Sequence, residues 1–234
     1  MRKGKLSIII PCYNEEATIG KIIEKIEQVK LPMKKEIIVV DESTDNSPEI
    51  VRRLTKKYRN IKLVHREKRS GKGFAIRIGL RYATGDIIII QDADLEYDPR
   101  DYKRLIAPIL KGKASVVYGS RALNPKNRIS YFSFWLGGRV LTWMTNFLFR
   151  TKITDVATCY KVFDSKVIKG VALKCYGFEF CPEVTAKIAK RGIHIYEVPI
   201  SYKPRKKEEG KKIKWTDGII ALLTLLRYRF FECD

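Results

Sequence analysis

Residues 86–94 read Asp-Ile-Ile-Ile-Ile-Gln-Asp-Ala-Asp. The apolar run Ile87–Ile90 indicates a short strand buried on both faces, which is typical of a parallel sheet. Two acidic residues, Asp92 and Asp94, follow this strand directly and crowd negative charge at its end. Such crowding is unfavourable unless a cation or hydrogen bonds compensate for it. The stretch therefore predicts a divalent-cation site at a sheet edge, and a solvated acidic turn is the alternative interpretation.

Strand-like and helix-like segments alternate on both sides of this stretch. We predict strands at residues 6–10, 36–40, 61–64, 86–90 and 114–118. Asn14 and Ser47 are expected to cap the first two intervening helices, and residues 71–82 and 101–110 to form two more. Helical connections of this length imply parallel strands joined by right-handed crossovers. Ligands in such sheets bind beyond the carboxyl ends of the strands. This rule singles out the segments Pro11–Glu15, Asp41–Asp45 and Asp92–Asp94.

The charge of the chain predicts anionic partners. The 234 residues include 47 Lys and Arg against 26 Asp and Glu, which gives a net charge of 47 − 26 = +21. A nucleotide, a lipid phosphate, an anionic membrane surface or a nucleic acid would match this excess. A nucleic-acid-binding module is the remote alternative, but the basic residues are spread over many segments and no such motif is recognisable. We therefore expect no nucleic-acid partner.

The second half of the chain differs in composition. Residues 131–150 are rich in aromatic and apolar side chains, with Gly137, Gly138 and Arg139 interrupting the run. No uninterrupted apolar span long enough for a transmembrane helix is present. This segment is either a buried core helix or an interfacial helix that faces lipid. Residues 185–191 and 215–231 are expected to be helical, and residues 193–202 to form a strand.

The cysteines and the N-terminal residues bear on the compartment. The five cysteines form no Cys-x-x-Cys pair, which argues against a zinc site or a secreted disulfide framework and favours reduced thiols. The N-terminal residues lack the pattern of a signal peptide. We expect a peripheral protein at the cytoplasmic face of a membrane.

Several motifs, taken together, resemble the family 2 glycosyltransferases, which are inverting enzymes of the GT-A type. They are Ser7–Glu16, Val39–Asp45, Ser70–Ala75, Asp92–Pro99, Gly119–Arg121, Gly177–Phe178 and Tyr202–Arg205. The later segments resemble the dolichol- or polyprenyl-phosphate mannose and glucose synthases. The resemblance implies an α/β fold with a Rossmann-like, mostly parallel central sheet flanked by helices, and C-terminal interfacial helices. It implies one domain over residues 1–234, with a nucleotide-sugar half at 1–125 and an acceptor half at 126–234.

The resemblance also implies roles for individual residues. The positions expected to bind a nucleotide sugar such as GDP-mannose or UDP-glucose are Pro11, Tyr13, Glu15, Asp41, Lys72, Asp92 and Ala93. Asp92 and Asp94 are expected to bind Mg²⁺ or Mn²⁺. Arg121 and Arg205 match basic residues near the phosphates of donor and acceptor and, with Asp94, are the expected catalytic residues. Glu42 departs from the family pattern, which usually has a second Asp there.

The acceptor implied by the resemblance is a polyprenyl or dolichyl phosphate. A phosphate monoester is already anionic, so it needs positioning and charge neutralisation and no strong base. The basic segment 203–214, including Lys211, is expected to contact that phosphate and to close over the diphosphate as a hinged loop. The alternative acceptor is a hydroxyl group on a glycan or another molecule, which would require a carboxylate base. Glu179 and Glu183 are the available candidates for that base.

Overall fold

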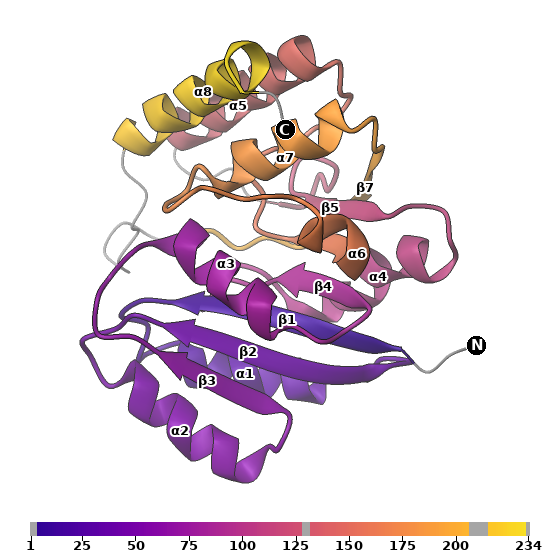
Figure 1. Cartoon of the computed structure of the whole chain (residues 1–234). Coiled ribbons are helices and arrows are strands. Elements are labelled where there is room, and N and C mark those ends of the chain that lie inside the picture. The colour runs from indigo at the N-terminus through magenta and orange to yellow at the C-terminus, as the bar shows by residue number, and fades with distance from the viewer. Residues whose placement is uncertain (1–3, 128–131, 206–214, 233–234) are drawn as a thin grey trace.

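The computed structural model describes residues 4–127, 132–205 and 215–232, and this part contains a seven-stranded mixed sheet (Figure 1). The strands are β1 (Lys5–Cys12), β2 (Lys34–Asp41), β3 (Ile61–His65), β4 (Ile87–Ile90), β5 (Val116–Ser120), β6 (Lys161–Asp164) and β7 (Ile195–Pro199). Their order across the sheet is β3-β2-β1-β4-β6-β5-β7. Strand β6 runs antiparallel to both of its neighbours, and the other neighbouring pairs are parallel. The sequence prediction of a mostly parallel α/β sheet is confirmed.

The central strands are held by β-branched side chains that are shielded on both faces. The isoleucines at 8–10 and 87–90 and the apolar residues at 37–40 are almost completely buried. This pattern explains why these runs form interior strands of a parallel sheet. The close approach of α3 (Lys72–Tyr82) to β1 depends on Gly79, because a Cβ atom there would lie 2.4 Å from Cγ2 of Ile9.

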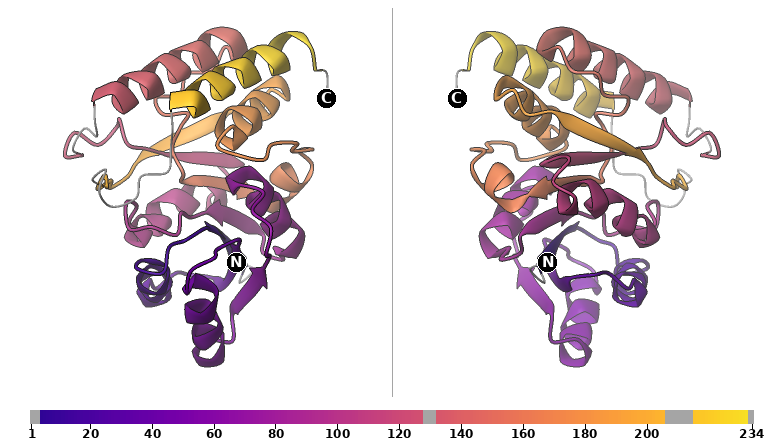
Figure 2. Two further views of the ribbon diagram at one scale, coloured as in Figure 1. Left: turned by 90° about the vertical axis from the view of Figure 1, so that its left-hand side faces the viewer. Right: turned by 90° about the vertical axis from the view of Figure 1, so that its right-hand side faces the viewer.

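The helices cover both faces of the sheet. They are α1 (Ile19–Gln28), α2 (Ser47–Lys57), α3, the 3₁₀ turn η1 (Pro99–Asp101), α4 (Tyr102–Leu110), α5 (Phe132–Phe149), α6 (Ser165–Lys169), α7 (Phe180–Lys190) and α8 (Trp215–Phe230). Helices α1 and α2 lie on one face of the sheet and α3 lies on the opposite face (Figures 1 and 2). The chain changes face because β2 and β3 extend the sheet to one side of β1, whereas β4 lies on the other side. The resulting switch point between β1 and β4 is where such sheets open a ligand crevice.

Two capping predictions were wrong. Helix α1 begins at Ile19 after Thr18, and Asn14 adopts a left-handed conformation with φ of 49°. The Asn14 side-chain oxygen accepts a hydrogen bond from the backbone N–H of Thr44 at 2.8 Å, so it links two loops instead of capping a helix. Asn46 occupies the cap position of α2, while Ser47 Oγ accepts a hydrogen bond from the backbone N–H of Glu15.

The helices of the second half form a separate layer. Helices α5 and α8 lie side by side at the end of the molecule farthest from α2, and both pack on α7 (Figures 1 and 2). Of the two interpretations left open for residues 131–150, the buried core helix does not hold, because Trp143 and Phe147 on α5 are 63% and 70% exposed. On α8, Trp215 is 76% exposed. No helix in the described part of the chain has the length and apolar character needed to cross a bilayer.

Candidate active site

A cavity of about 1100 Å³ opens between the carboxyl edge of the sheet and helices α5 and α8. Six parallel strands end at this edge, so the loops that follow them converge on one space. Most of the residues predicted to form the site line this cavity: Pro11, Tyr13, Glu15, Lys72, Asp92, Ala93, Asp94, Arg121 and Arg205. The fold therefore brings together predicted site residues from five separate segments of the sequence. Lys211 lies outside the described residues, as do residues 206–214 of the predicted hinged loop.

The first acidic residue of the predicted metal pair is neutralised by a lysine. The ammonium group of Lys72, at the start of α3, forms a salt bridge with Asp92, and both side chains are largely buried. Burial alone would raise the pKa of Asp92, but the adjacent Lys72 ammonium outweighs burial and lowers it. The same pairing raises the pKa of Lys72 against the opposing effect of burial. Asp92 is therefore an ionised carboxylate that already has a cationic partner.

The second acidic residue contacts an arginine. Arg205 Nη2 lies 2.8 Å from Asp94 Oδ2, and 2.9 and 3.0 Å from the two carboxylate oxygens of Glu15. The backbone N–H of Arg205 donates to Glu96 Oε1, and the Tyr202 hydroxyl donates to Glu96 Oε2. Glu96 was not among the predicted site residues, although its position two residues after Asp94 placed it at the same sheet edge. The acidic residues after β1 and β4 thus converge on one guanidinium group.

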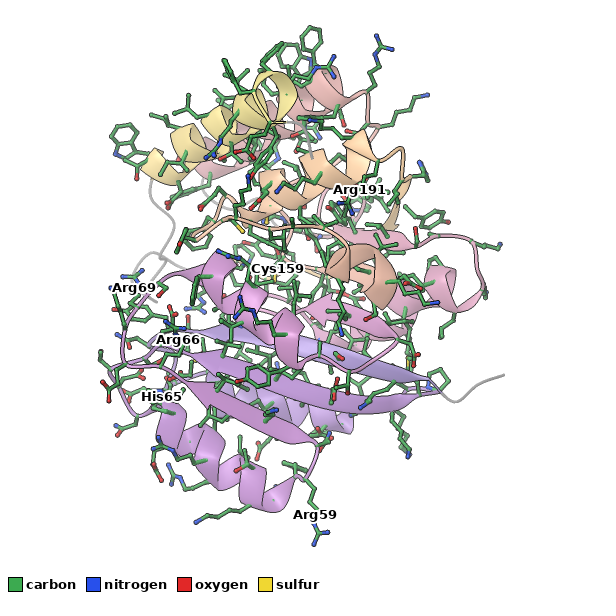
Figure 3. The ribbon with its side chains drawn as sticks, in the orientation of Figure 1. Arg59, His65, Arg66, Arg69, Cys159 and Arg191 are labelled. Carbon is green, nitrogen blue, oxygen red and sulfur yellow. The ribbon has the colours of Figure 1, made fainter. Side chains whose placement is uncertain are left out.

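The structure separates Asp41 from the cavity. Asp41 is fully buried, and its carboxylate contacts the Nδ1 atom of His65 and the hydroxyl of Ser43 at 2.9 and 2.7 Å. Its neighbour Glu42 lines the cavity instead, with Oε2 accepting hydrogen bonds from the backbone N–H groups of residues 70 and 71. Of these two neighbouring carboxylates, only that of Glu42 lines the cavity. His65, Arg66 and Arg69 lie at this same edge (Figure 3).

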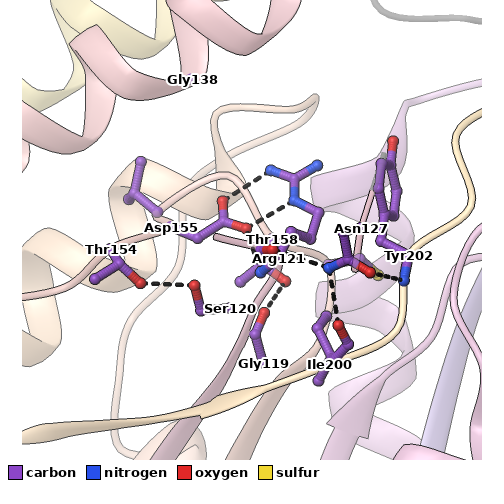
Figure 4. Close-up of polar contacts among 12 residues, drawn as sticks. Gly119, Ser120, Arg121, Asn127, Gly138, Thr154, Asp155, Thr158, Ile200 and Tyr202 are labelled. Atoms are coloured by element: carbon purple, nitrogen blue, oxygen red, sulfur yellow. Dashed lines mark hydrogen bonds and ion pairs between the residues drawn. The ribbon is translucent and has the colours of Figure 1, made fainter. Parts of the chain in front are cut away.

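Arg121 follows β5 and is held by a carboxylate. Its Nε and Nη2 atoms lie 2.7 and 2.8 Å from the two oxygens of Asp155, a bidentate geometry (Figure 4). Asp155 is itself fixed, since its backbone N–H donates to Glu197 on β7. Burial would raise the pKa of Asp155, but Arg121 outweighs burial and lowers it. A guanidinium has five N–H donors, so this pairing orients Arg121 and leaves donors for an anion in the cavity.

The helix side of the cavity adds residues that the sequence analysis did not assign to the site. From α5 they include Trp135, Arg139 and Leu141, and from α8 they include Trp215 and Ala221. The sequence of residues 131–150 did not indicate which side chains would line a cavity, because a helix that is apolar on several faces gives no clear periodicity. The cavity thus has an acidic and basic end at the sheet and an aromatic end at the helices.

Glu183 has a structural role. It is fully buried on α7, and its oxygens accept hydrogen bonds from the backbone N–H groups of Lys174 and Cys175 and from the Tyr228 hydroxyl. Lys187 Nζ lies 2.9 Å from Glu183 Oε1. The prediction of Glu183 as a possible base was therefore wrong, because its carboxylate is enclosed and ties α7 to α8. Glu179 accepts hydrogen bonds from the backbone N–H groups of Tyr176 and Gly177.

The carboxylates at the sheet edge fit a divalent cation. Mg²⁺ prefers oxygen ligands and is usually held by one or two carboxylates together with substrate phosphates. Within the described ranges, no group of three or more His, Cys, Asp or Glu side chains could hold a metal ion. Asp94 meets the requirement for a carboxylate facing the cavity, and the Arg205 guanidinium beside it shows that this position accommodates positive charge. Asp94 would be the principal protein ligand, because Asp92 is paired with Lys72.

Comparison with known proteins gives a family match and several relatives. Residues 7–171 match the model of glycosyl transferase family 2. The chain is 28% identical over 223 residues to a dolichol-phosphate mannosyltransferase of Pyrococcus furiosus, covering 88% of this chain and 59% of that protein. It is also 28% identical over 244 residues to the dolichyl-phosphate beta-glucosyltransferase ALG5A of Trichomonas vaginalis, covering 97% and 73%. A third relative, the low-salt glycan biosynthesis hexosyltransferase Agl6 of Haloferax volcanii, is 28% identical, with 87% of this chain and 49% of that protein covered. The chain thus spans about three fifths of the length of the first of these relatives and about half of the length of the third.

Solved structures share the fold. Glucosyl-3-phosphoglycerate synthase from Mycobacterium tuberculosis, in complex with phosphoglyceric acid, superposes with a TM-score of 0.76 at 20% identity, covering 99% of this chain and 82% of that one. The same protein in complex with Mn²⁺, UDP-glucose and phosphoglyceric acid gives a TM-score of 0.74 at 20% identity, with 99% and 81% covered. At this identity the likeness shows a common fold, which agrees with the GT-A expectation.

We predict that Glu183→Gln destabilises the protein by about 3 kcal/mol at neutral pH, because it leaves Lys187 buried without its carboxylate. Burial opposes ionisation of Glu183, but its hydrogen bonds outweigh burial and lower its pKa. A carboxylate with a lowered pKa in the folded state contributes stability that is lost as the pH falls. The free energy of unfolding, measured in urea, should therefore fall more steeply below about pH 4.5 for the wild type than for the variant.

Glu49→Gln, in an exposed pair with Arg52, is the matched control and should change the free energy of unfolding by less than about 0.5 kcal/mol. A Glu183→Gln protein of wild-type stability would contradict the structural role.

Proposed function

This chain belongs to glycosyl transferase family 2, and we propose that it transfers a hexose, mannose or glucose, from a nucleoside diphosphate donor to a polyprenyl or dolichyl phosphate at a membrane surface. The observation that carries the proposal is the composition of one cavity wall. Arg121 and Arg139 lie in it beside the aromatic side chains of α5 and α8. An anionic head group attached to an apolar chain would match both features. Two of the relatives are named as dolichyl- or dolichol-phosphate sugar transferases.

The donor would occupy the sheet end of the cavity. Tyr13 and Glu42 line the part next to β1 and β2, where a base and ribose would contact an aromatic ring and a carboxylate. The Arg69 guanidinium lies 4.0 Å from the centre of the Tyr13 ring and holds that ring in place. Lys72 and Arg205 supply positive charge near the diphosphate. Either GDP-mannose or UDP-glucose fits this description.

The acceptor phosphate would lie at Arg121 and Arg139. Arg121 is oriented by its bidentate pair with Asp155, so it loses little side-chain entropy when it binds an anion. Arg139 projects from α5 into the same cavity. Lys211 stays a proposed further contact. The division into a nucleotide half at 1–125 and an acceptor half at 126–234 stays a prediction, and Arg121 and Arg205 would each act across that boundary.

The surroundings of three carboxylates, those of Asp155, Glu179 and Glu183, favour a phosphate over a hydroxyl acceptor. Asp155 is ionised against Arg121 and has a lowered pKa, which makes it a weak base. Glu183 is enclosed, and Glu179 accepts hydrogen bonds from two backbone N–H groups. An acceptor that arrives as an anion requires no proton removal, so this arrangement suits a phosphate monoester.

The proposed reaction is a single displacement. A phosphate oxygen of the acceptor attacks C1 of the hexose from the side opposite the nucleotide. The bond between C1 and the diphosphate oxygen breaks, and its electron pair leaves with the nucleoside diphosphate, which inverts the configuration at C1. Mg²⁺ or Mn²⁺ bound at Asp94 would neutralise charge on the departing diphosphate. Lys72 and Arg205 would stabilise the same charge through fixed cationic groups.

Helices α5 and α8 would contact the membrane. Trp143 and Phe147 stack at 5.7 Å on the exposed side of α5, and Leu223 and Phe230 are exposed on α8. Exposed aromatic and aliphatic groups on adjacent helices are typical of an interfacial surface, and the net charge of +21 would attract anionic lipids. We place this surface at the cytoplasmic face of the membrane. The four cysteines in the described ranges are free.

We predict that lipid-extractable label will form when the protein is mixed with a labelled nucleotide sugar, a polyprenyl phosphate and Mn²⁺. A panel of GDP- and UDP-hexoses identifies the donor. Asp94→Ala should abolish transfer while leaving the free energy of unfolding within about 1 kcal/mol of wild type, since Asp94 faces the cavity. Label found only on a soluble hydroxyl acceptor, such as a glycan or phosphoglycerate, would contradict the lipid-phosphate assignment.

We also predict that the protein will sediment with vesicles of anionic phospholipid at low ionic strength and be released by about 1 M salt, where charge screening is nearly complete. Replacing Trp143 and Phe147 with Ser should weaken this binding several-fold. Leu110→Ser, which removes an exposed apolar side chain from α4, is the matched control and should bind like the wild type. Equal vesicle binding by all three proteins would contradict the proposal that α5 contacts the membrane.

A further inference from the structure

Arg205 occupies an unusual position for a residue expected near phosphates. Its Nη2 atom contacts Asp94 and Glu15 at 2.8 to 3.0 Å, and its side chain is only 14% exposed. These two carboxylates come from different loops, after β4 and before α1. A cation between them offsets the repulsion between two negative groups in a partly buried space. In this state the guanidinium stands where a divalent cation at Asp94 would carry its charge.

The backbone that carries Arg205 is anchored independently of its guanidinium group. The Arg205 and Lys203 N–H groups donate to the side chain and backbone carbonyl of Glu96 at 2.8 Å. Tyr202 forms an isolated β-bridge with Tyr97, and their rings pack at 5.3 Å. The Arg205 side chain could therefore leave Asp94 by side-chain rotation alone, without release of the segment.

We propose that Arg205 is a stand-in cation for the donor-free enzyme and exchanges its place at Asp94 with a divalent cation when the nucleoside diphosphate binds. This inference rests on the proposed function, because it takes Asp94 as the metal ligand. A guanidinium and a divalent cation repel each other, so a cation that arrives at Asp94 favours departure of the guanidinium. The incoming diphosphate supplies the anionic oxygens that the displaced guanidinium requires.

A thermodynamic consequence follows from this exchange. Arg205 lowers the affinity of the free enzyme for a divalent cation and raises it once a diphosphate is present. The cation and the nucleotide therefore bind with positive coupling, and each raises the affinity for the other by the same factor. Arg205 would thereby weaken the binding of a cation to the enzyme when no donor is present.

The test measures Mn²⁺ binding directly, by the electron paramagnetic resonance signal of the free ion, with and without GDP or UDP. Arg205→Gln should tighten the binding of Mn²⁺ alone by about tenfold, because it removes the repulsion between the guanidinium and the incoming cation. Two close cations in a partly buried site can repel each other by more than this change requires. The same variant should reduce the factor by which the nucleotide improves Mn²⁺ binding. Arg100→Gln changes the net charge equally at an exposed pair with Asp98 and should bind Mn²⁺ like the wild type.

The outcomes separate this inference from the function on which it rests. If Arg205→Gln binds Mn²⁺ alone no more tightly than Arg100→Gln does, the exchange is wrong. If Asp94→Asn binds Mn²⁺ and nucleotide as the wild type does, or if no protein binds Mn²⁺ with either nucleotide, the metal assignment at Asp94 fails and the exchange fails with it. Tighter binding of Mn²⁺ alone by Arg205→Gln, lost again when Asp94→Asn is added, supports both.

Discussion

Negative charge at the carboxyl edge of the sheet, and its neutralisation, is the constraint on which the rest of the site depends. Parallel strands deliver the loops that follow β1 and β4 to one edge, and these loops bring Glu15, Asp92 and Asp94 close together. Partial burial makes uncompensated carboxylates costly there. Lys72 from the start of α3 and Arg205 from the segment after β7 neutralise them. The same two cations are the groups that a departing diphosphate would require.

The opposite end of the cavity is built on a different principle. Arg121 is fixed by Asp155, which is held in turn by Glu197 on β7, so a chain of charged and polar contacts positions one guanidinium. Helices α5 and α8 add aromatic groups and leave many of their apolar side chains exposed. The buried Glu183, which contacts both Lys187 and the Tyr228 hydroxyl, ties this helical layer together. A charged site at the sheet edge and an aromatic wall from α5 and α8 thereby share one cavity.

The parts of this arrangement that depend on strand patterns could be predicted from the sequence. The isoleucine-rich runs at β1 and β4 predicted interior strands, and the acidic residues after β4 predicted a charged edge. Strand β6 was not predicted because it begins with the buried Lys161 and ends with Asp164. The ammonium group of Lys161 donates to the backbone carbonyls of Val156 and Thr158. A lysine in an interior strand gives no apolar signal.

Other features depend on contacts between distant segments, which local patterns do not contain. Sequence could not distinguish Asp41 from Glu42 as the cavity residue, because the choice follows from the way the chain turns after β2. Asp41 is enclosed by His65, 24 residues away, whereas Glu42 reaches the cavity. The enclosure of the Glu183 carboxylate could not be predicted either, because its partner Tyr228 lies 45 residues farther along the chain. In each case the decisive contact is tertiary.

The most direct measurement of the central claim is a crystal structure of the protein grown with Mn²⁺ and a nucleoside diphosphate sugar, with the metal located by its anomalous scattering. The account predicts a manganese peak coordinated by Asp94 and by diphosphate oxygens, with Lys72 still paired to Asp92. A peak elsewhere, or a diphosphate bound away from Asp92 and Asp94, would contradict it.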